Sequence, residues 1–131
     1  TMSLAMIDID DFKNYNDTKG HEEGNELLMR LAHVFRRNTR NCDILARYGG
    51  EEFVIIFPET ALEETVVVAE RICRAVAATL EVSVTIGLAG LPRHTADYNE
   101  LIRMADKAMY WGKQHGKNRI VVYEDSMSTC R

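Results

Sequence analysis

The sequence Gly49-Gly50-Glu51-Glu52-Phe53 lies between two runs that are rich in apolar, β-branched and aromatic residues. Residues 44–48 and 54–57 have the composition of strands, so the pentapeptide is predicted to form the turn of a β-hairpin. We expect the glycine pair to supply the positive φ angles of a tight turn and to let a ligand approach the backbone. Glu51 and Glu52 then lie at the rim of the turn, where two carboxylates suit a metal ion or a proton transfer.

Strand and helix patterns continue on both sides of this hairpin. A buried strand is predicted at 4–10, and because side chains alternate across a strand, Asp8 and Asp10 should share one face. A short polar helical turn at 12–19 should end at Gly20. Further helices are predicted at 21–37, at 60–80 with Thr60 and Glu63 as a capping box, and at 97–116 with Asp97 at its start. Strands are predicted at 82–88, half-buried by its alternation, and at 119–123.

The order of these elements defines the expected fold class. The 131 residues suit a single domain. Helices that alternate with strands around a central hairpin predict an α/β (α+β) fold, with a mixed sheet of about five strands flanked by helices and related to the ferredoxin-like arrangement. We expect residues 1–125 to form the domain and 126–131 a tail without pattern. A chain that opens in a core strand is expected to lack the start of its domain.

Composition restricts the classes of partner and compartment. The net charge of −4 indicates no general face for nucleic acid or another polyanion. Three cysteines without CxxC or Cys/His spacing argue against a disulfide framework and a zinc site, so a reducing cytoplasm is expected. No run approaches the roughly 18 apolar residues of a membrane helix. Direct membrane contact is not expected, and any membrane tether would come from sequence outside this chain.

Acidic residues occur at two predicted edges that the fold could bring together. If strand 4–10 pairs with the hairpin, Asp8 and Asp10 meet Glu51 and Glu52 and offer hard oxygen ligands. Such oxygens suit Mg²⁺, whose coordination substrate phosphates usually complete, and the ion would assist phosphoryl transfer. The alternative is that these acids only solvate strand ends and a turn, and spacing alone leaves both interpretations open.

These residues resemble the GGDEF family of diguanylate cyclases over nearly the whole chain. Four segments carry the resemblance in the family's order: Asp8-Ile-Asp-Asp-Phe-Lys13, Asn16-Asp17 with Gly20-His21, Gly49 to Phe53, and Ala105 to Tyr110 with Lys113, Gly116, Lys117 and Asn118. The family's D.LTGL.NR segment, expected upstream of Thr1, and any regulatory domain are missing. The resemblance implies a bacterial enzyme with the palm-like core of nucleotidyl cyclases.

The resemblance also implies a reaction and its residues. Asp8, the carbonyl of Ile9 and Glu51 would hold Mg²⁺ (or Mn²⁺), with Glu52 as second-metal ligand, and Glu51 or Glu52 would help to deprotonate a 3′-hydroxyl. Each of two antiparallel protomers would bind one GTP, and each 3′-hydroxyl would attack the other's α-phosphate, which gives cyclic di-GMP and two pyrophosphates. A homodimer is therefore implied. The implied phosphate partners are Lys13, Lys113, Lys117 and the backbone N–H groups of Asp11 and Phe12.

Base reading and inhibition complete what the resemblance implies. Asn16 matches the family's base-binding Asn, but Asn25 stands where the family usually has Asp. A carboxylate can accept two hydrogen bonds from the guanine edge, whereas an amide offers one acceptor and one donor group, so the substitution could weaken GTP binding or loosen base choice. Arg40 and Asp43 fit the RxxD site at which cyclic di-GMP binds back and inhibits.

Two other functions compete with the cyclase. One is a catalytically silent receptor module that binds cyclic di-GMP or GTP, using Arg40 and Asp43 for the cyclic dinucleotide. The other is a cyclase of altered base choice, for which Asn25 is the hint. The intact Gly-Gly-Glu-Glu-Phe sequence favours the enzyme, because a receptor has no need of metal-binding acids.

Overall fold

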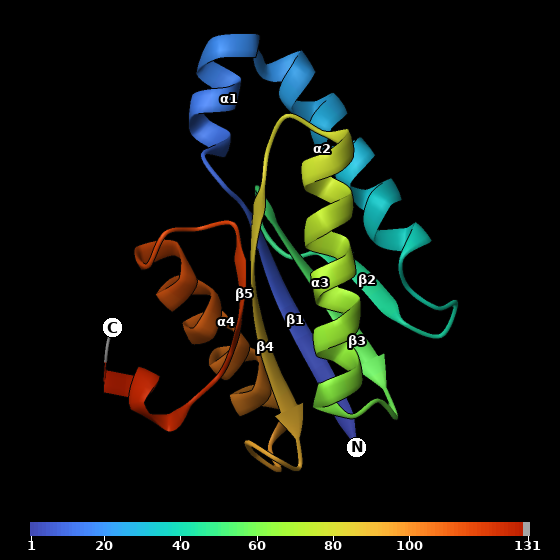
Figure 1. The fold of residues 1–131 in the computed structure, drawn as a ribbon, viewed down its shortest axis with the longest axis vertical. Helices are drawn as coiled ribbons and strands as arrows, with labels where there is room; N and C mark the ends of the chain where they lie inside the picture. Colours follow the sequence, from blue (N-terminus) through green and yellow to red (C-terminus); the bar gives the residue numbers. More distant parts are fainter. Residues whose placement is uncertain (130–131) are drawn as a thin grey trace.

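A five-stranded sheet carries helices on both faces in the computed structural model, which describes residues 1–129 (Figure 1). The strands lie in the order β2-β3-β1-β4-β5; β4 and β5 pair in parallel and the other neighbours are antiparallel. The predicted α+β fold with a mixed sheet is confirmed. The elements are β1 (Met2–Ile9), α1 (Phe12–Lys19), α2 (His21–Arg37), β2 (Ile44–Arg47), β3 (Glu52–Pro58), α3 (Leu62–Thr79), β4 (Val84–Leu91), α4 (Tyr98–Gln114), β5 (Arg119–Val122) and the 3₁₀ helix η1 (Asp125–Thr129).

Two apolar clusters hold the layers together. Helices α2 and α3 cover one face of the sheet and α4 covers the other (Figure 1). The half-buried state predicted for β4 is wrong, because every residue of this strand except Leu91 is buried. Helices on both faces leave no solvated side to the central strands. At Gly87 a Cβ atom would lie 2.1 Å from the carbonyl oxygen of Ala105, so α4 packs directly on the strand's backbone.

The predicted hairpin is confirmed, but its turn differs from the expectation. Strands β2 and β3 pair antiparallel, and residues 48–51 connect them. The expected positive φ angles at Gly49 and Gly50 are wrong; among the described glycines, Gly20 and Gly116 have them. A four-residue loop does not need the left-handed geometry that a two-residue turn demands. The Glu52 carbonyl closes the loop by accepting from the N–H groups of Tyr48 at 2.8 Å and Gly49 at 3.3 Å.

Helix starts were predicted with mixed success. Asp97 caps α4, and its side chain accepts from the Asn99 N–H at 2.9 Å, as expected. The capping box of Thr60 and Glu63 is wrong, because α3 begins after Ala61 without a side-chain cap. The Thr60 hydroxyl instead donates to the Pro58 carbonyl at 2.8 Å. The Thr60 hydroxyl oxygen accepts from the Arg40 guanidinium at 2.6 Å instead of from an N–H group of the helix.

The end of the chain also differs from the expectation of a patternless tail. Residues 125–129 form η1, and Met127 is buried in the cluster beneath α4. The domain boundary after residue 125 stays a prediction, and residues 130–131 of the expected tail, including Cys130, lie outside the described residues. Within residues 1–129, no helix combines the length and apolar character that a membrane crossing demands.

Candidate functional site

The acidic end of β1 lies beside the acidic start of β3. Antiparallel pairing sets Asp8 opposite Glu52, and the Ile9 N–H donates to the Glu51 carbonyl at 3.4 Å. In this register Ile7 lies opposite Phe53 and Met6 opposite Val54, so buried apolar residues of the two strands face one another. The sheet therefore brings together the two sites that the sequence places 43 positions apart in the chain, Asp8 and Glu51.

Asp8 and Glu51 form an interacting carboxyl pair. Burial, together with the hydrogen bond and the charge of Asp8, raises the pKa of Glu51 to about 7. Burial also raises the pKa of Asp8, against the opposing charge of Lys113. Like charges held close in a partly dry site disfavour the doubly ionised state. Binding of a proton or of a cation would therefore reduce the repulsion between the two carboxylates.

A divalent cation fits this pair. Asp8 Oδ1 is buried and has no hydrogen-bond partner among the described residues. This oxygen lies 3.5 Å from the Lys113 ammonium and beside a second carboxyl, and two carboxylate oxygens are the hard ligands that Mg²⁺ prefers. Within residues 1–129, no three side chains of the His, Cys, Asp or Glu type are grouped as a metal site. Further ligands would have to be backbone carbonyl, water or phosphate oxygens, as Mg²⁺ commonly accepts.

Lys113 brings a positive charge from the last turn of α4 to the end of β1. Its ammonium donates to the Ile9 carbonyl at 3.0 Å and to Asp10 Oδ1 at 2.7 Å, and lies 3.5 Å from Asp8 Oδ1. Lys117 donates to Asp11 Oδ1 at 2.7 Å. Both lysines therefore lie against acidic residues at the C-terminal end of β1.

Asp10 does not join Asp8 as a free oxygen donor, which corrects the expectation of one four-acid cluster. It is 4 % exposed and lies just after β1. Both of its carboxylate oxygens are occupied by hydrogen-bond donors. The donors are Ser83 Oγ at 2.6 Å, Thr85 Oγ1 at 2.6 Å, Lys113 Nζ at 2.7 Å and the Asn118 N–H at 2.9 Å. Burial would raise the pKa of Asp10, but the bonds from Lys113, Ser83 and Thr85 hold it below its usual value.

One open cavity of about 580 Å³ collects most of the predicted site residues. It lies where the β1 end, the β2–β3 loop and α4 meet. The predicted site residues that line it are Asp8, Ile9, Asp11, Phe12, Lys13, Glu51, Glu52, Lys113 and Lys117. The start of α1 contributes Phe12 and Lys13 to this lining, and helix N-termini favour anions. Acidic residues and three lysines line the same cavity, and this combination of charges suits a metal-bound polyphosphate. A cavity of about 620 Å³ on another face of α1 also contains Asp10 and Asp11, but neither Asp8 nor Glu51.

Several residues that line or support the cavity were not predicted from the sequence. Asp106 and Tyr110 line the cavity from α4, and Tyr110 is 38 % exposed there. Their place in the motif that starts at Ala105 was the available signal. Arg47 donates to the carbonyls of Gly50 at 2.6 Å and Gly49 at 3.3 Å, and so it braces the loop that carries Glu51. No local pattern marks an arginine for that task.

The two predicted base-binding residues lie outside this cavity. Asn16 packs against α2, where a Cβ atom on Gly24 would lie 1.8 Å from Asn16 Oδ1. That oxygen is buried and has no hydrogen-bond partner among residues 1–129. Asn25 lines a separate pocket of about 450 Å³ with Leu28 and Arg47 among its walls. The structure therefore does not gather Asn16 and Asn25, predicted to bind the base, into one cavity with the lysines predicted to bind phosphate.

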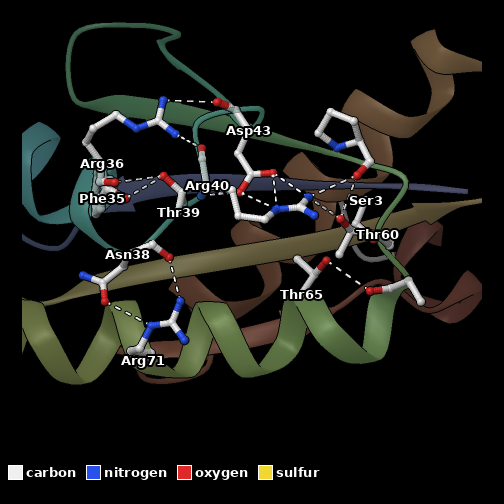
Figure 2. Close-up of polar contacts among 12 residues, drawn as sticks. Ser3, Phe35, Arg36, Asn38, Thr39, Arg40, Asp43, Thr60, Thr65 and Arg71 are labelled. Carbon is white, nitrogen blue, oxygen red and sulfur yellow. Dashed lines mark hydrogen bonds and ion pairs between the residues drawn. The ribbon is translucent and has the colours of Figure 1, made fainter.

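Arg40 and Asp43 bind each other rather than facing solvent as a free pair (Figure 2). Arg40 Nη2 lies 2.7 Å from Asp43 Oδ1, and the Arg40 N–H donates to Asp43 Oδ2 at 2.7 Å. The Arg40 guanidinium also donates to Thr60 Oγ1 at 2.6 Å and to the Pro58 carbonyl at 3.1 Å. The side chain of Asp43 is 2 % exposed, whereas that of Arg40 is 53 % exposed. This network ties the segment after α2 to the β3–α3 connection.

A pocket of about 250 Å³ adjoins this network and is rich in arginine. Arg37, Arg40 and Arg71 all line it. Arg71 reaches across from α3 and donates to Asn38, to the carbonyl at 2.7 Å and to Oδ1 at 3.1 Å (Figure 2). The contact joins residues 33 positions apart, so sequence spacing could not reveal it.

Comparison with known proteins gives consistent matches. Residues 1–119 match the family described as "Diguanylate cyclase, GGDEF domain". The chain is 37 % identical to Diguanylate cyclase A of Treponema denticola over 135 residues, which cover 97 % of this chain and 36 % of that protein. The chain thus spans about a third of the length of the curated relatives that it matches.

Solved structures agree with these sequence matches. The active GGEEF domain of a diguanylate cyclase from Vibrio cholerae superposes with a TM-score of 0.88 at 32 % identity, over 95 % of this chain and 83 % of that one. The GGDEF domain of DgcB from Caulobacter crescentus, solved in complex with c-di-GMP, gives a TM-score of 0.82 at 34 % identity, over 92 % of this chain and 77 % of that one. This chain belongs to the GGDEF domain family of diguanylate cyclases.

Proposed function

We propose that this chain is the catalytic domain of a diguanylate cyclase, which condenses two GTP molecules into cyclic di-GMP and two pyrophosphates with Mg²⁺ or Mn²⁺. One observation carries the proposal. The Asp8–Glu51 carboxyl pair lies in the same cavity as Lys13, Lys113 and Lys117. A cation held by the acids and a polyphosphate held by the lysines would occupy adjoining parts of that cavity.

The residues divide the work in a way that suits phosphoryl transfer. Asp8, the Ile9 carbonyl and Glu51 would hold the metal ion, with Glu52 as ligand of a second one. When bound, the ion would polarise the phosphate and balance its negative charge. Positioning and electrostatic stabilisation supply most of the catalysis in such reactions. The lysines and the N–H groups of Asp11 and Phe12 would orient the triphosphate.

The bond changes require a base and a second protomer. The 3′-hydroxyl oxygen of one GTP forms a bond to the α-phosphorus of the other, the bond to pyrophosphate breaks, and Glu51 or Glu52 accepts the hydroxyl proton. In the metal-free chain the pKa of Glu51 is raised to about 7. A bound cation would favour its ionised carboxylate, which is the form that accepts a proton. One cavity per chain holds one triphosphate, so two antiparallel chains are needed for the two transfers.

Base choice is proposed to favour GTP. The orphaned, buried Oδ1 of Asn16 can accept a hydrogen bond, and guanine offers donors on its N1 and N2 edge. Asn25 provides one acceptor and one donor group at a position where a carboxylate could accept two hydrogen bonds from guanine. A cyclase of altered base choice is therefore the outcome to test against GTP specificity.

Product inhibition is proposed at the pocket beside Arg40 and Asp43. Three arginines line that pocket, and guanidinium groups bind phosphate in a fork geometry. Because Arg40 already holds Asp43 and Thr60, cyclic dinucleotide would have to compete with these contacts. A regulatory domain upstream and a location in the bacterial cytoplasm remain further proposals.

The test incubates a dimerised form of the chain with Mg²⁺ and GTP, ATP or both, and identifies the dinucleotide by mass. Cyclic di-GMP from GTP alone supports the proposal, and mixed or adenine products would show altered base choice. Glu51→Ala should abolish turnover and keep the fold. No turnover in the dimerised form, with cyclic di-GMP binding that Arg40→Ala removes, would instead show a receptor module.

A further inference from the structure

Asp10 is a heavily hydrogen-bonded acid beside the site, and the proposed metal binding and proton transfer do not involve it. Four donors converge on its two oxygens, two on each. The donors come from three separate regions: the start of β4, the end of α4 and the residue before β5. A buried carboxylate with every acceptor site engaged is a poor metal ligand, because coordination would break existing bonds.

One of these bonds, an ion pair, holds the side chain of Lys113. Asp10 Oδ1 receives the ammonium at 2.7 Å, and the same ammonium donates to the Ile9 carbonyl at 3.0 Å. A lysine ammonium is carried on a flexible stem of four carbons, so it keeps one position only where hydrogen-bond partners hold it. Lys113 is 18 % exposed in its side chain and faces the cavity that contains Asp8 and Glu51. Asp10 thus determines where this charge lies relative to the acid pair.

The other oxygen of Asp10 supports the segment that carries Lys117. Asp10 Oδ2 accepts from the Asn118 N–H at 2.9 Å. Lys117 and Asn118 have φ angles of 58° and 47°, a left-handed conformation that non-glycine residues adopt only where the surroundings hold it. Fixing Asn118 therefore fixes the backbone from which Lys117 projects into the cavity.

We propose that Asp10 is a positioning residue that sets both Lys113 and Lys117 in place for the phosphates of a bound nucleotide. The proposal rests on the proposed function, since it assumes that these lysines contact a triphosphate. It assigns Asp10 a task different from that of Asp8, two residues earlier. Asp8 would face the cation, and Asp10 would arrange the charges that face the phosphates.

The test measures binding rather than turnover. Dissociation constants are determined with Mg²⁺ for α,β-methylene-GTP, which cannot transfer its α-phosphate, and for GMP. Asp10→Asn places an amide NH₂ where donors already converge, so both lysines should lose their position. We expect the preference for the triphosphate over GMP to fall roughly tenfold or more, the usual size of an effect on an outer partner of a contacting group. Asp17→Asn, the same change at an exposed α1 position, should leave the preference unchanged.

Two further variants distinguish this positioning role of Asp10 from a purely structural one. Thr85→Val removes one bond to Asp10 and should lower the melting temperature, but the preference for the triphosphate should persist because the carboxylate still holds Lys113. In a Lys113→Met background, Asp10→Asn should cost less preference than in the wild type, since one of its two targets is gone. An equal loss in both backgrounds would overturn the proposal.

Two results separate the possible failures. If the wild-type chain does not bind the triphosphate analogue, the proposed function fails and this inference with it. If the wild type binds and Asp10→Asn retains the full preference, only the role of Asp10 is overturned. Should Asp10→Asn not fold, Lys113→Arg decides: it keeps the charge but changes the donor geometry, and an unchanged preference would show that position does not matter.

Discussion

Gly87→Ala tests the close contact between α4 and the sheet on which the site depends. The added Cβ would lie 2.1 Å from the Ala105 carbonyl oxygen and 2.3 Å from the Met109 nitrogen. Both neighbours are helix backbone, so no side chain can rotate away to relieve the overlap. Since real Cβ contacts essentially never fall below 3.0 Å, α4 must retreat by close to 1 Å along this contact.

The expected cost follows from overpacking of a buried interface. Such insertions destabilise a protein by about 3 kcal/mol at the upper end of the usual range. With an unfolding entropy of about 2.1 cal/mol/K per residue, that loss lowers the melting temperature of a domain of this size by about 10 °C. Because α4 also carries Lys113, affinity for a triphosphate should fall more than affinity for GMP.

Gly90→Ala on the same strand is the matched control. Its Cβ would meet Leu62 Cβ and the Met2 carbonyl oxygen at 3.6 Å, which is ordinary contact. Neither glycine has a positive φ angle, so alanine can adopt the local backbone conformation at both positions, and the two variants differ in the space around the new Cβ atom. Gly90→Ala should raise stability by about 0.4–1 kcal/mol, through the smaller entropy of the unfolded chain. Thermal unfolding followed by circular dichroism measures both variants, and equal melting temperatures would refute the packing argument.

Three further predictions concern the acids and the arginine network. Glu51→Gln should retain the fold and lower cyclic dinucleotide formation by about 100-fold or more, measured by product mass; near-normal turnover would remove Glu51 from the metal site. In the metal-free chain, the pKa of Glu51 is raised to about 7, so its contribution to stability is full below its ordinary value of 4.5 and is lost as pH rises through about 7. Mg²⁺ should therefore raise the melting temperature more at pH 8 than at pH 6, and an equal rise, or the same difference in Glu51→Gln, would contradict the pairing with Asp8. Arg40→Ala should lower the melting temperature more than Arg93→Ala, because it leaves the buried Asp43 carboxylate without its guanidinium; equal melting temperatures would show that the network adds nothing to stability.

Much of the fold could be predicted from local pattern. The 3.6-residue period delimits α2, predicted at 21–37 and found at His21–Arg37. The hairpin and the Asp97 cap depend on neighbours in sequence, and both are present. The acidic ends of β1 and β3 were expected to meet if the strands paired, and they do. These features rest on short-range propensity and on the alternation of a strand, which the sequence displays directly.

What the sequence determined by itself is the order of elements, the family resemblance and the types of residue available to the site. Tertiary structure decided which residue has which partner. Asp8 and Asp10 look equivalent in sequence, yet one keeps a buried oxygen that accepts no hydrogen bond and the other gathers four donors, all of them 73 to 108 residues away. Thr60 likewise lies where a cap was expected but binds Arg40. Hydrogen-bond partners and burial depend on contacts across the folded chain, and no local pattern encodes them.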